Sequence, residues 1–148
     1  MKLLKSKFHG TYWEARRIEY SVEVLPIADL WASVPQVETL RNKPFHENLK
    51  NDIEKDGLHF PLLTVHATYN DVWLQKEKYK SSLCELPFTL TEENKEDKMY
   101  VIWGGSQRVR VAQELGYTHI DCAMIPNFKD ARLLQRYMRA PYMKRYYE

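Results

Sequence analysis

The segment 99–116 places two glycines and two arginines at a predicted junction between a strand and a helix. Residues 99–103 are apolar and predict a buried strand, and residues 107–115 have the spacing of an amphipathic helix. Gly104 and Gly105 between them permit a sharp turn and a close approach of a ligand to the backbone. Because a helix start offers unpaired N–H groups and a partial positive charge, this junction favours an anion such as a phosphate group.

The first turn of this helix departs from the usual charge pattern. Helix first turns generally carry Asp or Glu, which suit the positive end of the helix dipole. Here no acid occurs before Glu114, and the positions that could contact an anion are Ser106, Gln107, Arg108 and Arg110. Cations at a helix start cost about 0.3–1 kcal/mol each unless an anion lies nearby. The pattern therefore indicates an anion site in residues 104–108, which we call the Gly-Gly loop.

Arg108 has an unusual position on the helical wheel. It lies within the angle of the apolar stripe, so we expect its side chain to point toward the core. The stripe consists of Val109, Val111, Ala112 and Leu115. A long helical side chain leans back toward the N-terminus, which would bring the guanidinium over the anion position. The alternative is that Arg108 pairs with a buried carboxylate and that the glycines only make a turn.

The rest of the chain must position this loop. The length of the whole chain, 148 residues, fits one domain. Its formal net charge of +2 is not typical of a dedicated nucleic-acid binder. We expect an α+β fold, a small mixed sheet flanked by helices, over residues 20–127. An N-terminal arm at 1–19 precedes it, and a C-terminal helix with a basic tail at 128–148 follows it.

Apolar periodicity predicts the individual elements within this plan. Strands are predicted at 20–25, 61–67, 99–103 and 119–125. Helices are predicted at 47–56, 107–115 and 128–138, with a single helical turn at 26–31. Gly57 is expected to end the first of these helices in a left-handed conformation, and Gly116 is expected to end the second. Residues 70–98 are predicted to be an inserted loop or hairpin.

The cysteines and histidines indicate no metal site. Cys84 and Cys122 are the only cysteines, and neither has a second Cys or His at ligand spacing. We expect reduced thiols in a cytoplasmic protein. No apolar run approaches the ~18 residues of a membrane span, and the N-terminus lacks the apolar core of a signal peptide.

The Gly-Gly loop and its helix resemble the nucleotide-binding core of the ParB/sulfiredoxin superfamily. ParB proteins carry a strand, then Gly-Glu-Arg-Arg-x-Arg-Ala-Ala, then a glycine that closes the helix, then another strand. The matching positions in this chain are Gly105, Arg108, Arg110, Ala112 and Gly116. Two further segments extend the resemblance in the right order. Residues 53–63 resemble the ParB helix–Gly-x-x-x-Pro–strand segment, and residues 20–30 resemble its opening strand.

This resemblance, which covers residues 20–67 and 99–126, implies a nucleotide site. The implied ligands are ATP, ADP or CTP, with Mg²⁺ as a candidate cofactor. The implied binding residues are Gly57, Pro61, Gly104, Gly105, Ser106, Gln107, Arg108 and Arg110.

Departures from the family pattern argue against two of the activities known in this superfamily. Sulfiredoxins carry Gly-Gly-Cys-His-Arg at this loop, with the cysteine as redox nucleophile. Ser106 stands at that position here, so we expect no sulfinic-acid reductase activity. ParB partition proteins have DNA-reading and dimerisation domains after the nucleotide domain. Because the sequence given ends at Glu148, we expect a standalone domain.

Three classes of function stay open. The first is a nucleotide-dependent enzyme, a phosphotransferase or NTPase, since the chain also resembles ParB-like free-serine kinases. The second is a non-catalytic module that binds nucleotide or protein. The third is a DNA-acting, ParB-like nuclease or partition-type protein of phage or plasmid origin. The candidate catalytic acids are Glu47 and Asp56, on the helix that leads into Gly57, although a solvated helix face is the alternative.

The C-terminal segment 128–148 has a charge that the rest of the chain does not share. It carries six basic and two acidic residues, interleaved with tyrosines. Basic residues among aromatic ones suit nucleic acid, because phosphate contacts combine with base stacking. The candidate contacts to a nucleic acid or protein partner are Arg132, Arg136, Arg139, Lys144 and Arg145. The alternative is a helix that packs on the domain and leaves its arginines solvated.

Overall fold

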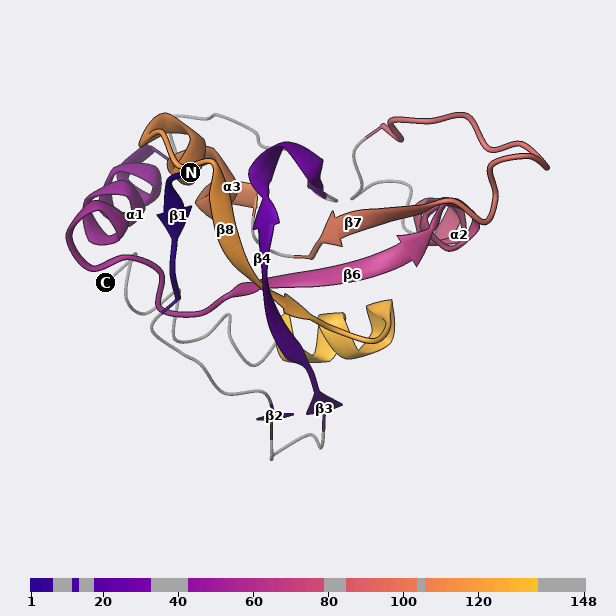
Figure 1. The fold of residues 1–148 in the computed structure, drawn as a ribbon, viewed down its shortest axis with the longest axis horizontal. Helices are drawn as coiled ribbons and strands as arrows, with labels where there is room; N and C mark the ends of the chain where they lie inside the picture. Colours follow the sequence, from indigo (N-terminus) through magenta and orange to yellow (C-terminus); the bar gives the residue numbers. More distant parts are fainter. Residues whose placement is uncertain (7–11, 14–17, 33–42, 79–84, 104–105, 136–148) are drawn as a thin grey trace.

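Strand β8 (His119–Met124) lies at the centre of a curled mixed sheet (Figure 1). The computed structural model describes residues 1–6, 12–13, 18–32, 43–78, 85–103 and 106–135. Over these residues the chain is α+β, as the sequence predicted.

Among the described residues, three strands pair directly with β8. β1 (Leu3–Leu4) and β6 (Leu62–Thr68) are parallel to it, and β4 (Ser21–Pro26) is antiparallel. Because β4 follows the whole of β8 along one edge, β1 and β6 must share the other edge. β1 lies beside Ile120 there, and β6 lies beside Cys122.

The sheet continues beyond β6 through two more strands. β7 (Lys98–Ile102) is antiparallel to β6, and β5 (Leu30–Ala32) is parallel to β7. A separate antiparallel ladder joins β2 (Tyr12–Trp13) to β3 (Ile18–Glu19).

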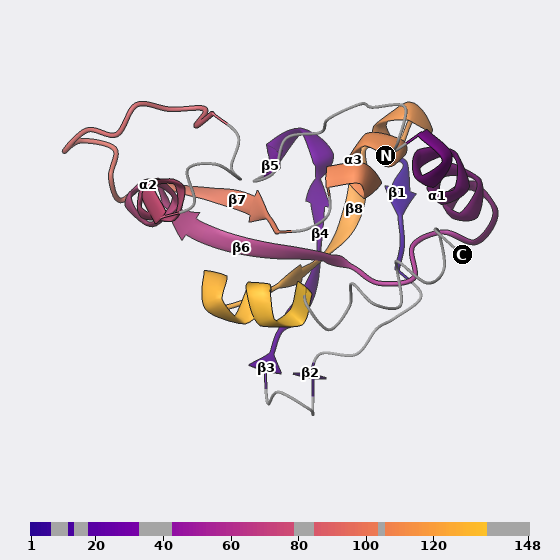
Figure 2. The ribbon, with the colours of Figure 1, turned by 180° about the vertical axis from the view of Figure 1, so that it is seen from behind.

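The helices gather at opposite ends of the sheet. α1 (Lys43–Asp56) and α3 (Ser106–Glu114) lie together at one end, and α2 (Tyr69–Lys78) lies at the other (Figures 1 and 2). Residues 128–135 form a further helical segment after β8. A 3₁₀ turn at Ile27–Asp29 connects β4 to β5.

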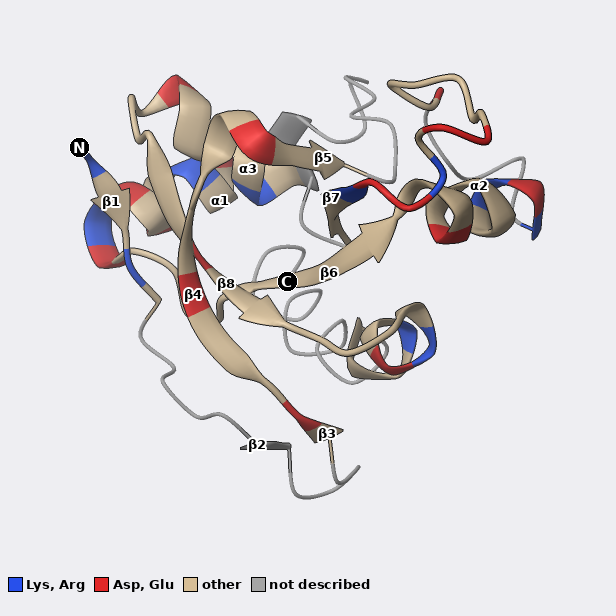
Figure 3. Ribbon diagram, turned by 45° about the vertical axis from the view of Figure 1, so that its right-hand side comes forward, with Lys and Arg blue, Asp and Glu red and all other residues tan. Residues whose placement is uncertain are grey.

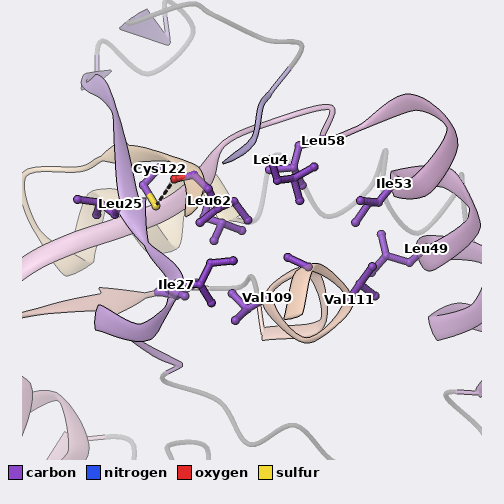
Figure 4. Close-up of a cluster of buried hydrophobic side chains, with 13 residues drawn as sticks. Leu4, Leu25, Ile27, Leu49, Ile53, Leu58, Leu62, Val109, Val111 and Cys122 are labelled. Carbon is purple, nitrogen blue, oxygen red and sulfur yellow. Dashed lines mark hydrogen bonds between the residues drawn. The ribbon is translucent and has the colours of Figure 1, made fainter. Parts of the chain in front are cut away.

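Alternate residues of β6 and β8 face opposite sides of the sheet, and both sides are buried. On one side Leu62, Ile120 and Cys122 belong to a cluster completed by apolar residues of α1 and α3 (Figure 4). On the other side Leu63 and Ala123 belong to a cluster that includes residues of α2 and of the helix 128–135. A sheet covered on both faces explains why these strands read as nearly continuous apolar runs.

The structure confirms most of the predicted elements. The four predicted strands are β4, β6, β7 and β8, and the predicted helices at 47–56 and 107–115 are α1 and α3. Gly57 and Gly116 end these helices with φ of +74° and +81°, which favours glycine because it lacks a Cβ. The helical turn predicted at 26–31 is shorter and runs into β5. The helix predicted at 128–138 is described as far as residue 135.

Two predicted segments differ in the structure. Residues Tyr69–Lys78 form helix α2, whereas residues 70–98 were predicted to be an inserted loop or hairpin. Thr68 Oγ1 caps it by accepting a hydrogen bond from the backbone N–H of Asp71 at 3.2 Å, and Val72 is buried. The predicted arm at 1–19 contributes β1 to the sheet, with Leu4 and Ser6 each only 2% exposed.

Candidate functional site

The strand and the helix that were predicted on either side of Gly104 and Gly105 are both present in the structure. β7 ends at Ile102, and the N–H of Trp103 donates to the carbonyl of Leu63 at 2.8 Å. α3 begins at Ser106 and has no acidic residue in its first turn. Gly104 and Gly105 lie outside the described residues.

Arg108 points toward the core, as its position on the helical wheel predicted. It is 6% exposed, and its Nη1 donates to the backbone carbonyl of Phe60 at 2.8 Å. Phe60 lies in the loop Gly57–Pro61, the second segment that resembled ParB. The hydrogen bond therefore joins two sequence segments 48 positions apart into one candidate site.

Backbone contacts hold the Gly57–Pro61 loop against the N-terminal strand. The N–H of Gly57 donates to the carbonyl of Ile53 at 2.9 Å, which closes α1. The N–H of Leu58 then donates to the carbonyl of Lys5 at 3.2 Å. Leu58 and Pro61 are buried, so the loop has a fixed path beside the start of α3.

Two of the other predicted anion contacts on α3 are less buried than Arg108, and the side chain of Ser106 is outside the described part of the structure. Gln107 is half-buried. Arg110 is also half-buried, and its Nε lies 3.4 Å from Oε1 of Glu114 in an i,i+4 ion pair. Arg110 is thus engaged along the helix, whereas Arg108 reaches across to the neighbouring loop.

Asp52 and His59 form a pair that the sequence analysis missed. His59 Nε2 lies 2.9 Å from Asp52 Oδ2, across the turn at Gly57. The side chain of Asp52 is 13% exposed, and that of His59 is 23% exposed. The signal was available, because a left-handed glycine after a helix folds the following residues back toward the last turns of that helix.

A second carboxylate–histidine pair lies at the opposite end of α3. Glu114 lies 3.0 Å from His46 Nε2 and 3.3 Å from Lys50 Nζ, both on α1. Partial burial would raise the pKa of Glu114, but the hydrogen bonds and positive charges of His46 and Lys50 together hold that pKa below its usual value. These contacts fasten α1 to the C-terminal turn of α3.

The two acids proposed as catalytic candidates lie on α1 with exposed side chains. Glu47 is in its first half, and Asp56 is its last residue. Nine residues of helix separate them by about 13 Å along the axis, so they cannot act on one substrate atom together. Of the two, only Asp56 adjoins the Gly57–Pro61 loop.

Among the described residues, no group of three or more His, Cys, Asp and Glu side chains could hold a metal ion. None of the described helices has the length and apolarity needed to cross a membrane.

Cys122 lies in the core of the sheet. It is 0% exposed, and burial is the main cause that raises its pKa to about 11, even though Thr64 and the positive charge of Arg108 act in the opposite direction. A protonated, enclosed thiol is a poor nucleophile. The other cysteine, Cys84, is outside the described residues.

We therefore expect Cys122 to resist thiol reagents in the folded protein. In a Cys84→Ser background at pH 8, a pKa near 11 leaves about a hundredfold less thiolate than a pKa near 9. Labelling by a chromogenic disulfide should be at least about a hundredfold slower than in denaturant. Labelling of the native chain at the denatured rate would contradict this placement of Cys122.

The helix 128–135 packs on the sheet through its apolar face. Phe128, Ala131 and Leu134 are buried, and the Phe128 ring lies 5.7 Å from that of Trp103. Arg132 is half-buried, and the other proposed contacts, Arg136, Arg139, Lys144 and Arg145, are outside the described residues. Both acidic and basic residues occur on this helix and on α1 and α2 (Figure 3).

No family model, no curated protein and no solved structure matches this chain.

Proposed function

We propose that this chain is a ParB/sulfiredoxin-like domain that binds a nucleotide through the Gly-Gly loop and the Gly57–Pro61 loop. The observation that carries the proposal is the hydrogen bond from Arg108 Nη1 to the carbonyl of Phe60. It brings together two of the three segments whose residues suggested the family, although they are far apart in the sequence.

The charges around the loop support phosphate as the recognised group. The first turn of α3 lacks acids, so no carboxylate of that turn offsets the positive end of the helix dipole, which favours an anion there. Mg²⁺ would suit this site without a dedicated cage, because it commonly binds through one or two carboxylates together with substrate phosphates. Asp56, the last residue of α1, is an exposed carboxylate next to the Gly57–Pro61 loop.

Calorimetric titration with ATP, ADP and CTP, each with and without Mg²⁺, tests this function. We expect heat of binding for at least one nucleotide and none for adenosine or cytidine, since the phosphates supply the charge that the loop recognises. A well-folded chain that binds none of the three nucleotides would refute the proposal. Equal binding of nucleoside and nucleotide would refute the role of the Gly-Gly loop.

A further inference from the structure

The pair Asp52–His59 has the geometry of a positioned general base. A carboxylate only accepts hydrogen bonds, so the 2.9 Å contact places the ring hydrogen of neutral His59 on Nε2. The lone pair is then on Nδ1, on the side of the ring away from Asp52. Asp52 is the more enclosed partner, whereas the His59 ring remains partly exposed and can meet a ligand.

His59 belongs to one of the two loops of the proposed nucleotide site. It lies in the Gly57–Pro61 loop, and the next residue, Phe60, accepts the hydrogen bond from Arg108 in the first turn of α3. The hydroxyl of Ser6 donates to the carbonyl of His59 at 3.4 Å. The backbone that carries the ring is therefore held from two sides.

We propose that His59, positioned by Asp52, is the general base of a nucleoside triphosphatase reaction, an inference that rests on the proposed function. His59 Nδ1 takes a proton from a water molecule as the water oxygen bonds to the terminal phosphorus. The bond from that phosphorus to the bridging oxygen breaks, and the nucleoside diphosphate leaves with the electron pair. Asp52 stabilises the imidazolium, which then returns its proton to the solvent.

His46 provides a matched control within the same helix pair. It also contacts a carboxylate, Glu114 at 3.0 Å, and has a similar side-chain exposure of 18%. That pair lies at the last turn of α3, about 12 Å along the helix from its first residue. If the Asp52–His59 contact matters only for stability, replacing His59 should have the same effect on turnover as replacing His46.

Phosphate release from ATP and CTP with Mg²⁺, measured beside nucleotide affinity, tests the inference. We expect His59→Gln to lower turnover by about 10²–10⁴-fold, with the nucleotide Kd changed by less than about threefold. Asp52→Asn should lower turnover by at least about tenfold, because it no longer holds the ring in the required tautomer. His46→Gln should keep wild-type turnover. Imidazole added to His59→Ala should restore part of the rate.

The outcomes separate this inference from the proposed function. If the wild type binds nucleotide but releases no phosphate, His59 is not a general base, while the proposed nucleotide site stands. Wild-type turnover in His59→Gln, or an equal loss in His46→Gln, would also overturn it. Absence of nucleotide binding would refute both the proposed function and the role of His59 as general base.

Discussion

Truncation after Asn127 should lower the free energy of unfolding by about 5 kcal/mol, because it removes the buried side chains of Phe128, Ala131 and Leu134 from the sheet. In a chain of this size we expect the melting temperature to fall by about 10–20 °C. Leu134→Ala alone should cost about 2–5 kcal/mol. Lys129→Ala, at an exposed position of the same helix, should have almost no effect.

The same truncation decides between the two interpretations of the C-terminal segment. A filter-binding assay with DNA and RNA at low salt, run beside the thermal melts, provides the comparison. If the truncated chain melts like the full chain but loses nucleic acid that the full chain retains, the segment is a binding arm rather than part of the core. The buried face of the helix 128–135 favours the structural outcome.

Arg108→Ala should have two separable effects. It removes the hydrogen bond from Arg108 to the carbonyl of Phe60 and creates a space beside the sheet, so we expect a loss of about 2–4 kcal/mol in the free energy of unfolding. If the guanidinium also contacts phosphate, nucleotide affinity should fall by about 10–100-fold.

Two further variants separate stability from affinity at Arg108. Arg108→Lys keeps the positive charge but loses the planar fork, so it should retain more affinity than Arg108→Ala. Lys129→Ala removes a positive charge remote from the loop in sequence and should bind nucleotide normally. A folded Arg108→Ala chain with unchanged melting temperature would contradict the contribution of the Phe60 contact. Unchanged affinity would contradict the contact with phosphate.

The direction of the Arg108 side chain could be predicted from the sequence, but its partner could not. The helical wheel placed Arg108 among apolar neighbours, and the side chain is indeed buried. A backbone carbonyl, however, has no residue-specific signal, and Phe60 lies 48 positions away. The pair Asp52–His59, by contrast, had a sequence signal, because the left-handed conformation expected at Gly57 folds His59 back toward the last turns of α1.

Tertiary contacts also explain the elements that the sequence analysis missed. Helix α2 has exposed Trp73 and Leu74, so its apolar residues do not form the stripe by which helices are identified. β1 consists of only Leu3 and Leu4, and its pairing partner begins at His119. Such a short strand forms because the edge of β8 is available, and local preference contributes little.

The central place of β8 has a consequence for how the protein acquires its structure during translation. The three described strands that pair with it leave the ribosome before it does, since β1, β4 and β6 precede residue 119. The nascent chain therefore carries these strands without the one that joins them until residues 119–124 have been made. Pairing across such long sequence separations slows folding, and strand edges left unpaired meanwhile favour aggregation. Newly made chains should accordingly depend on chaperones more than small helical domains do.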